Sequence, residues 1–204
     1  DLLGGWVRDL RYFWFKDAML EGIPLKVLRA GWSKQGGFEL FLMDGSKGDQ
    51  LWNLVKEAGK PFDIGPGYPN PSERTESGLL NWGADTDEAT NPFEVRLGRF
   101  VDLDLPGDVI GVAALNRIKA DGVQRHQLGI MLELPEEPEQ QAAWLPIRKN
   151  GTPIGHMTHT AWSYRLKRLI GYALVSANAQ PGDLVTVEKG AETVAGKLTN
   201  LPFL

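Results

Sequence analysis

The stretch Arg29–Phe41 carries the residues of this 204-residue chain that are best suited to bind a small molecule. It reads Arg-Ala-Gly-Trp-Ser-Lys-Gln-Gly-Gly-Phe-Glu-Leu-Phe, so a glycine-rich turn separates the indole of Trp32 from the carboxylate of Glu39. Glycine lets a chain reverse direction tightly, which would aim both groups into one space. An aromatic surface and a hydrogen-bond acceptor that converge in this way indicate a small-molecule site.

Each of these groups also has a simpler interpretation. Acidic residues are mostly solvated, so Glu39 taken alone is usually a surface residue of a strand. Trp32 taken alone is more often a packing residue than a platform for a ligand. Further along, Arg165, Lys167 and Arg168 form a basic cluster between two expected strands. Such a cluster is ordinarily a solvated loop, although it could also receive the anionic tail of a ligand.

Other catalytic chemistries find little support in the sequence. Among the three histidines, His126, His156 and His159, the last two are three apart on an expected strand, so they should point to opposite faces and cannot jointly hold a metal. The chain contains no GxSxG elbow, phosphate-binding glycine loop or metalloprotease helix. Cysteine is absent, which excludes disulfides, thiolate metal sites and cysteine nucleophiles. We therefore predict no metal site and assign no certain catalytic residue.

Two strands must position the turn within Arg29–Phe41. Apolar residues alternate with others over 23–28 and again over 38–43, which is the period of a pleated strand. Because the two runs flank the glycine turn, we expect them to pair as an antiparallel hairpin. The spacing of apolar residues further predicts three helices, over 51–58, 72–82 and 112–120. Gly59 would end the first of them in a left-handed cap.

The pattern changes after Gly122. Short β-like runs with turn residues between them follow without intervening helices, over 127–132, 154–162, 169–175, 184–188 and 193–198. This arrangement is typical of a barrel or a sandwich. We therefore predict an α+β chain with antiparallel sheets and helices over residues 1–123, followed by a small all-β domain over residues 124–204.

The composition of the chain limits the kinds of partner that it can bind. The net charge of −4 argues against nucleic acid, and no apolar run approaches the roughly 20 residues of a membrane span. The N-terminus has no basic segment leading into an apolar one, so we expect no secretory signal and predict a cytoplasmic location. The chain begins at Asp1 within a stretch that already resembles folded sequence, so we expect a fragment without its N-terminal part. The oligomeric state stays open.

Several segments, in order, resemble one family. Gly31–Phe41, GWSKQGGFELF, is similar to the GYTGEDGFEI segment of the folate-dependent aminomethyltransferases, the glycine cleavage T-protein family. It resembles the dimethylsulfoniopropionate demethylase branch of that family more closely still. Residues 70–79, NPSERTESGL, resemble the demethylase form of the family's ARDxxRLEAGL helix. Asn91–Glu94 resembles a turn that follows this helix, and Leu201–Phe203 resembles the family's closing strand.

The resemblance implies a cloverleaf of three domains around a central tetrahydrofolate, with a small antiparallel β-barrel as the last domain. The family's pterin-binding glutamate falls on Glu39, its turn aromatic on Trp32, and an aromatic of the demethylase branch on Phe41. A carboxylate suits the first role because a pterin offers an amino group and a ring N–H side by side. We expect Trp32 and Phe41 to position the reactants.

The charged substrate and the folate tail would require basic partners. Arg29, Lys34 and Arg74 are candidates for a substrate carboxylate, and Arg74 is also an expected folate contact. Arg165 and Lys167 are weaker candidates for the glutamate tail of the folate.

Asn70 separates the branches of the family. An arginine of the aminomethyltransferases falls on this position, and its Pro-Asn-Pro setting cannot reproduce that side chain. The catalytic aspartate of true aminomethyltransferases would lie in the N-terminal region that we expect to be missing. The resemblance therefore implies a tetrahydrofolate-dependent methyltransferase that converts dimethylsulfoniopropionate to methylthiopropionate and forms 5-methyltetrahydrofolate. The alternatives are an aminomethyltransferase of the glycine cleavage system, another folate-dependent demethylase, and a non-catalytic folate-binding or scaffold protein.

Overall fold

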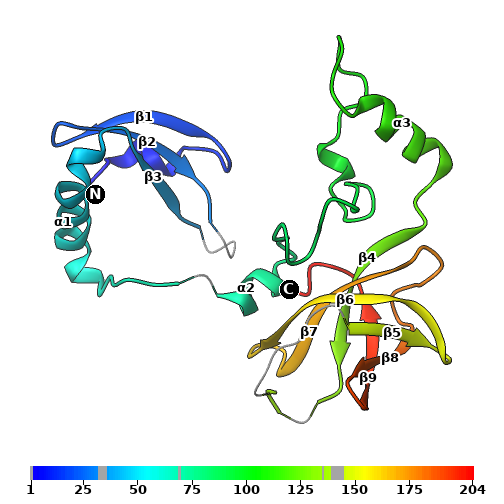
Figure 1. Cartoon of the computed structure of the whole chain (residues 1–204). Helices are drawn as coiled ribbons and strands as arrows, with labels where there is room; N and C mark the ends of the chain where they lie inside the picture. Colours follow the sequence, from blue (N-terminus) through cyan, green and yellow to red (C-terminus); the bar gives the residue numbers. More distant parts are fainter. Residues whose placement is uncertain (1, 32–35, 69, 135, 139–144) are drawn as a thin grey trace. The chain divides into compact units, whose positions relative to one another are not determined.

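Residues 2–31, 36–68, 70–134, 136–138 and 145–204 are described by the computed structural model (Figure 1). The chain divides into two units, Asp1–Asn70 and Pro71–Leu204. Within the described ranges, no helix has both the length and the apolar character needed to cross a membrane.

The first unit is built on a three-stranded antiparallel sheet in the order β1-β2-β3. Its strands are β1 (Phe15–Leu20), β2 (Ile23–Arg29) and β3 (Phe38–Leu42). The predicted hairpin of residues 23–28 with 38–43 is confirmed, with Leu28 opposite Glu39 and Leu25 opposite Leu42. Gly36, between β2 and β3, adopts a φ of 78°, a left-handed conformation that glycine reaches without strain.

One face of this sheet is buried. Ile23, Leu25 and Val27 of β2 form its core, since alternate residues of a strand share a face. Helix α1 (Gly48–Gly59) packs Leu51 and Leu54 against them, and the 3-10 turn η1 (Gly5–Arg8) adds Trp6. The opposite face of the sheet is left open within this unit.

Helix α1 confirms the expected helix over 51–58 but ends differently. Gly59 has right-handed angles, and the chain continues into the 3-10 turn η3 (Lys60–Phe62), so the left-handed residue is Asp63 at a φ of 54°. Gly59 serves close packing instead, because a Cβ on it would lie 1.8 Å from Cγ2 of Ile64. The expected left-handed cap at Gly59 is therefore wrong.

The second unit begins with helix α2 (Pro71–Glu76), which is shorter than the expected helix over 72–82. Gly78 adopts a φ of 71°, its N–H donates to the Thr75 carbonyl, and the N–H of Leu79 donates to the Arg74 carbonyl. These paired bonds are a Schellman motif, which satisfies the last carbonyls of the helix and turns the chain away. The later elements before the barrel are the 3-10 turn η4 (Gly98–Phe100) and helix α3 (Val112–Asp121), which confirms the helix expected over 112–120.

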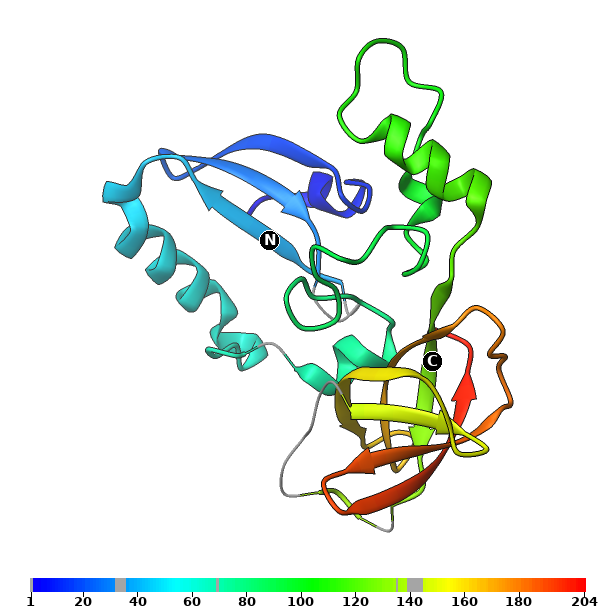
Figure 2. The ribbon, with the colours of Figure 1, turned by 45° about the vertical axis from the view of Figure 1, so that its right-hand side comes forward.

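A closed six-stranded antiparallel barrel follows (Figure 2). Its strands run in the order β4-β7-β6-β5-β8-β9. They are β4 (Arg125–Leu132), β5 (Leu145–Lys149), β6 (Thr152–Ser163), β7 (Arg168–Ser176), β8 (Leu184–Lys189) and β9 (Glu192–Thr199). Ile130, Ile147 and Leu198 are fully buried in its core. The barrel confirms the α+β fold class, while the domain boundary between residues 123 and 124 stays a prediction.

The segment Asn91–Glu94 is fastened to the first barrel strand. The Asn91 side chain accepts hydrogen bonds from the backbone N–H groups of Phe93 and Glu94, and Glu94 Oε2 accepts one from the N–H of Asn91. Nε of Arg125, the first residue of β4, lies 2.7 Å from Glu94 Oε1. The segment is therefore a capped turn, and its carboxylate pairs with the start of the barrel.

Candidate ligand-binding site

The open face of the β1-β2-β3 sheet brings Glu39 and Phe41 together with residues of the other two strands. The register places two rows across this face, Phe15–Leu28–Glu39 and Asp17–Lys26–Phe41. All of them alternate with the buried residues of the opposite face, so their side chains point away from α1.

Apolar rings on this face remain exposed. Phe15 is 60% exposed and Phe41 is 49% exposed, and together with Lys26 and Leu28 they line a solvent-open hollow of ≈ 270 Å³. Glu39 is exposed beside the hollow, directly opposite Leu28. Contiguous exposed apolar groups with a few polar neighbours mark binding surfaces. The hollow and Glu39 together form our candidate ligand-binding site.

Lys26 supplies the positive charge of this site. Its Nζ lies 2.6 Å from Asp17 Oδ1 and 5.2 Å from the centre of the Phe15 ring. The ion pair is solvent-exposed, and such pairs contribute little stability. An acceptor atom of a ligand could therefore bind the Lys26 ammonium alongside Asp17 or in its place. Sequence reasoning missed Lys26, because only the pairing register shows that it shares a face with Glu39.

The turn residues predicted for this site are only partly placed. Trp32 and Lys34 lie outside the described residues. Arg29 falls on the buried face of β2, where its guanidinium donates to the backbone oxygens of Leu10 at 2.6 Å and Arg8 at 3.3 Å. Arg29 thus fastens the N-terminal segment to the sheet, on the face opposite Glu39.

Arg74 lies in the second unit and is deeply buried. It is 2% exposed, and its Nη1 donates to Asp85 Oδ2 at 2.5 Å and to the Leu79 carbonyl at 2.8 Å. Its guanidinium also lies 5.7 Å from the centre of the Tyr172 ring. These contacts give Arg74 a structural role in joining α2 to the barrel. A role in folate binding stays a prediction.

His159 and Tyr172 border the same buried polar cluster. The Tyr172 hydroxyl donates to the Leu79 carbonyl at 2.9 Å, and burial raises the pKa of Tyr172 above its ordinary value. Burial, aided by the positive charge of Arg74, lowers the pKa of His159 to about 4. Within this cluster, Asp85 Oδ1 and His159 Nε2 are buried and have no hydrogen-bond partner among the described residues. Burial and the charge of Arg74 thus favour the neutral form of His159.

The predicted opposite orientation of His156 and His159 is wrong. A β-bulge between Met157 and His159 inserts one residue into β6, and Met157 and Thr160 both line the barrel interior. His156 precedes Met157 and His159 precedes Thr160, so both histidines point away from the barrel interior. Within the described ranges, no group of three or more histidine or acidic side chains could hold a metal ion.

The basic cluster after β6 has acidic neighbours in the same unit. Arg165 Nη1 lies 3.4 Å from Glu76 Oε2, and Arg165 Nη2 lies 3.6 Å from Glu73 Oε1. Ser163 Oγ donates to Glu76 Oε1 at 2.6 Å. Lys167 is exposed in the turn that leads into β7. Both cations stay predicted contacts of a folate tail, and Arg165 already has acidic neighbours within α2.

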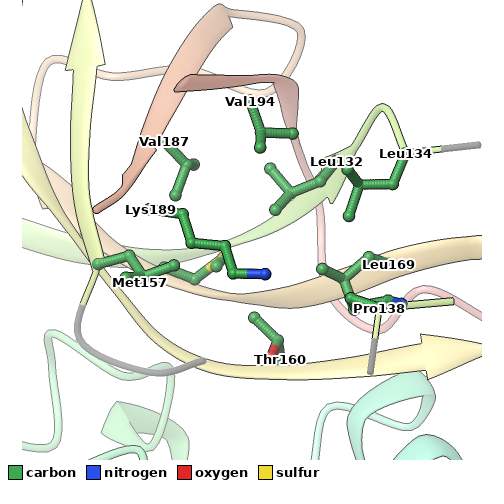
Figure 3. Close-up of a pocket in the computed structure, with 10 residues that line it drawn as sticks. Leu132, Leu134, Pro138, Met157, Thr160, Leu169, Val187, Lys189 and Val194 are labelled. Carbon is green, nitrogen blue, oxygen red and sulfur yellow. The ribbon is translucent and has the colours of Figure 1, made fainter. Parts of the chain in front are cut away.

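The barrel also contains a small cavity (Figure 3). Its volume is ≈ 20 Å³, and it is lined mainly by aliphatic side chains such as Leu132, Met157, Leu169 and Val187. The Lys189 side chain extends beside these groups in Figure 3. A space this small holds about one water molecule, so it cannot accept a pterin.

Two family models match the chain. The model of the GCVT N-terminal domain matches residues 6–105, and the model of the glycine cleavage T-protein C-terminal barrel domain matches residues 125–204. The chain belongs to the glycine cleavage T-protein family. The first match contains the candidate site on the β1-β2-β3 sheet, and the second contains the barrel strands.

Relatives within the family carry two different names. The dimethylsulfoniopropionate demethylase of Ruegeria pomeroyi is 39% identical over 156 residues, which cover 76% of this chain and 42% of the relative. The aminomethyltransferase of Halothermothrix orenii is 30% identical over 199 residues, which cover 96% of this chain and 54% of the relative. The chain thus spans about half the length of these relatives.

A solved structure supports the fold. The glycine cleavage system aminomethyltransferase T of Bartonella henselae superimposes with a TM-score of 0.77 at 20% identity. The superposition covers 98% of this chain and 54% of that structure. At this identity the likeness speaks for the T-protein fold and not for the reaction.

Proposed function

We propose that this chain is part of a tetrahydrofolate-dependent methyltransferase that demethylates dimethylsulfoniopropionate. The products are methylthiopropionate and 5-methyltetrahydrofolate. The observation that carries the proposal is the exposed carboxylate of Glu39 beside a hollow lined by Phe15 and Phe41. That combination fits the two recognition needs of a pterin.

A pterin is a flat ring with an amino group and a ring N–H on one edge. A carboxylate accepts both hydrogens bidentately, and charge-assisted bonds of this kind are about twice as strong as neutral ones. The exposed faces of Phe15 and Phe41 offer an apolar surface for the ring itself. Glu39 and Phe41 thus act as the proposed folate contacts.

The chemistry requires mainly positioning. Tetrahydrofolate supplies a nucleophilic N5 atom as the methyl acceptor, and a sulfonium methyl group is already activated for transfer. The protein therefore has to hold donor and acceptor in line and exclude water. In this proposal Trp32 faces either the sulfonium cation or the pterin, since an aromatic ring attracts a desolvated cation.

The substrate carboxylate needs a cation. Arg29 lies on the face of the sheet opposite Glu39, where its Nη1 donates to the backbone oxygens of residues 8 and 10, so we take Lys34 as the proposed partner in the first unit. Arg74, Arg165 and Lys167 of the second unit remain proposed contacts of the folate.

The choice of methyl donor rests on one comparison and one expectation from the sequence. The Ruegeria pomeroyi demethylase is 39% identical, and Asn70 stands between two prolines where the resemblance to aminomethyltransferases implies an arginine. The second candidate is an aminomethyltransferase, because relatives with that name are about 30% identical over nearly the whole chain. Donor identity therefore has to be decided by product analysis.

The protein is tested by incubation with tetrahydrofolate and dimethylsulfoniopropionate, followed by mass spectrometry of the products. We expect methylthiopropionate and 5-methyltetrahydrofolate in equal amounts, and neither with Glu39→Gln. A parallel reaction receives an aminomethyl donor in place of the sulfonium. Turnover of that donor alone would support the aminomethyltransferase. Folate binding without turnover of either donor would support the scaffold alternative.

A further inference from the structure

Lys26 lies on the open face beside the proposed folate contact Glu39. Lys26 is opposite Phe41, and Glu39 is opposite Leu28, so the lysine and the glutamate are diagonal neighbours on β2 and β3. Diagonal neighbours on one face are about 7–8 Å apart, within reach of a long side chain. Lys26 lines the hollow, and Glu39 lies next to the hollow because its partner Leu28 lines it as well.

The edge of a pterin presents three groups in a row. These are the amino group at position 2, the N–H at position 3 and the carbonyl oxygen at position 4, which means two donors followed by one acceptor. A carboxylate accepts from the first two groups. The third group requires a donor placed beside the carboxylate, and a lysine ammonium carries three.

We propose that Lys26 is a specificity-determining residue of this site that donates to the carbonyl oxygen at position 4 of the pterin. The inference rests on the proposed function, because it takes Glu39 as the acceptor of the two neighbouring donors. Lys26 thereby adds to the selectivity of the site for a 4-oxo pterin over a 4-amino one, since an amino group would turn donors against the ammonium. A neutral 4-amino pterin also lacks the N–H at position 3, and that difference acts at Glu39.

The surroundings of Lys26 permit this role. Asp17 Oδ1 holds the ammonium at 2.6 Å, but Asp17 is 76% exposed and the pair is open to solvent. The ammonium also lies 5.2 Å from the centre of the Phe15 ring, which borders the hollow. With three donors, Lys26 can keep Asp17 and still bind a ligand oxygen.

The test uses calorimetric titration of the full chain, without oxygen, with tetrahydrofolate and with its 4-amino analogue. Lys26→Met keeps the apolar stem and removes the charge, while Asp17→Asn is the matched control that removes only the ion pair. We expect Lys26→Met to weaken tetrahydrofolate binding by about tenfold or more, and to leave the 4-amino analogue unchanged or more tightly bound. Asp17→Asn should bind tetrahydrofolate at least as well as the original chain.

The outcomes separate this inference from the function on which it rests. If Glu39→Gln weakens folate binding by about thirtyfold or more but Lys26→Met leaves it within a factor of about two, the role of Lys26 is overturned and the folate site stands. If Lys26→Met weakens the binding of both ligands equally, Lys26 does not distinguish a 4-oxo from a 4-amino pterin and the inference is overturned. If Glu39→Gln leaves folate binding intact, the proposed function itself fails.

Discussion

Leu28 lies directly opposite Glu39 across β2 and β3, and this register puts the Glu39 carboxylate on the same face as the hollow between Phe15 and Phe41. A slip of one residue would turn Glu39 toward the buried core and Leu40 toward solvent. The pairing of the two strands therefore decides whether the glutamate can meet a ligand. The contacts of α1 with the opposite face hold that pairing in place.

Removal of the Phe41 ring should weaken folate binding without unfolding the chain. Phe41 lines the hollow and is half exposed, so Phe41→Ala loses ring contact with a ligand but little core packing. We expect a loss of about 0.5–1.5 kcal/mol in binding free energy, measured by calorimetric titration with tetrahydrofolate. Met43→Ala is the control, since Met43 is similarly exposed nearby but does not line the hollow. Equal losses in both variants would contradict a specific role for Phe41.

Loss of the Arg74–Asp85 ion pair should destabilise the second unit. Both side chains are almost completely buried, and Asp85→Asn would leave the Arg74 guanidinium without its counter-charge. Breaking a buried pair in this way costs about 3–5 kcal/mol, which urea unfolding would measure. The matched change Glu57→Gln breaks the exposed pair with Lys60 and should cost less than about 1 kcal/mol. Similar costs for the two changes would show that the buried pair is dispensable.

The pKa of His159 makes stability depend on pH. Burial lowers this pKa from 6.5 to about 4, so the unfolded chain binds a proton near pH 6.5 while the folded chain does so only near pH 4. The unfolded state therefore holds more protons between these values, and stability falls as the pH falls through that window. In urea unfolding at a series of pH values, His159→Gln should lose less stability on acidification than the original chain. An identical loss would show that His159 does not control it.

Gly171 should tolerate no side chain. A Cβ at this position of β7 would lie 2.2 Å from the backbone oxygen of His159 on the neighbouring strand. We expect Gly171→Ala to cost about 1–3 kcal/mol of unfolding free energy, because a strand backbone must shift. Gly65→Ala, where nothing lies within 4 Å of the added atom, is the control and should change stability little. A neutral Gly171→Ala would contradict the close approach of the two strands.

Local patterns in the sequence predicted much of the fold. The alternation of Ile23, Leu25 and Val27 predicted a strand, because every second residue of a strand lies on the same face and the three side chains can be buried together. The short runs after Gly122 predicted the barrel for the same reason. The helix over 72–82 was predicted too long, because its apolar and polar spacing continues past Gly78 while the left-handed glycine ends the helix.

The rest depended on contacts between segments distant in the sequence. The outward position of both His156 and His159 follows from a bulge that only the pairing of β6 with β7 shows. Lys26 enters the candidate site through its register with Phe41. Arg29 and Arg74 were predicted to meet a ligand, yet both are held by groups elsewhere in the chain, Leu10 and Asp85.

The most direct test is the affinity of tetrahydrofolate for the original chain and for Glu39→Gln. It is measured by calorimetric titration under conditions in which both chains are folded. The substitution keeps the size of an exposed side chain and removes its charge, so the fold should be unaffected. We expect it to weaken binding by about thirtyfold or more, because the carboxylate accepts two charge-assisted hydrogen bonds that the amide cannot replace. Binding of unchanged affinity in a folded Glu39→Gln chain would contradict the assignment of Glu39 as the pterin contact.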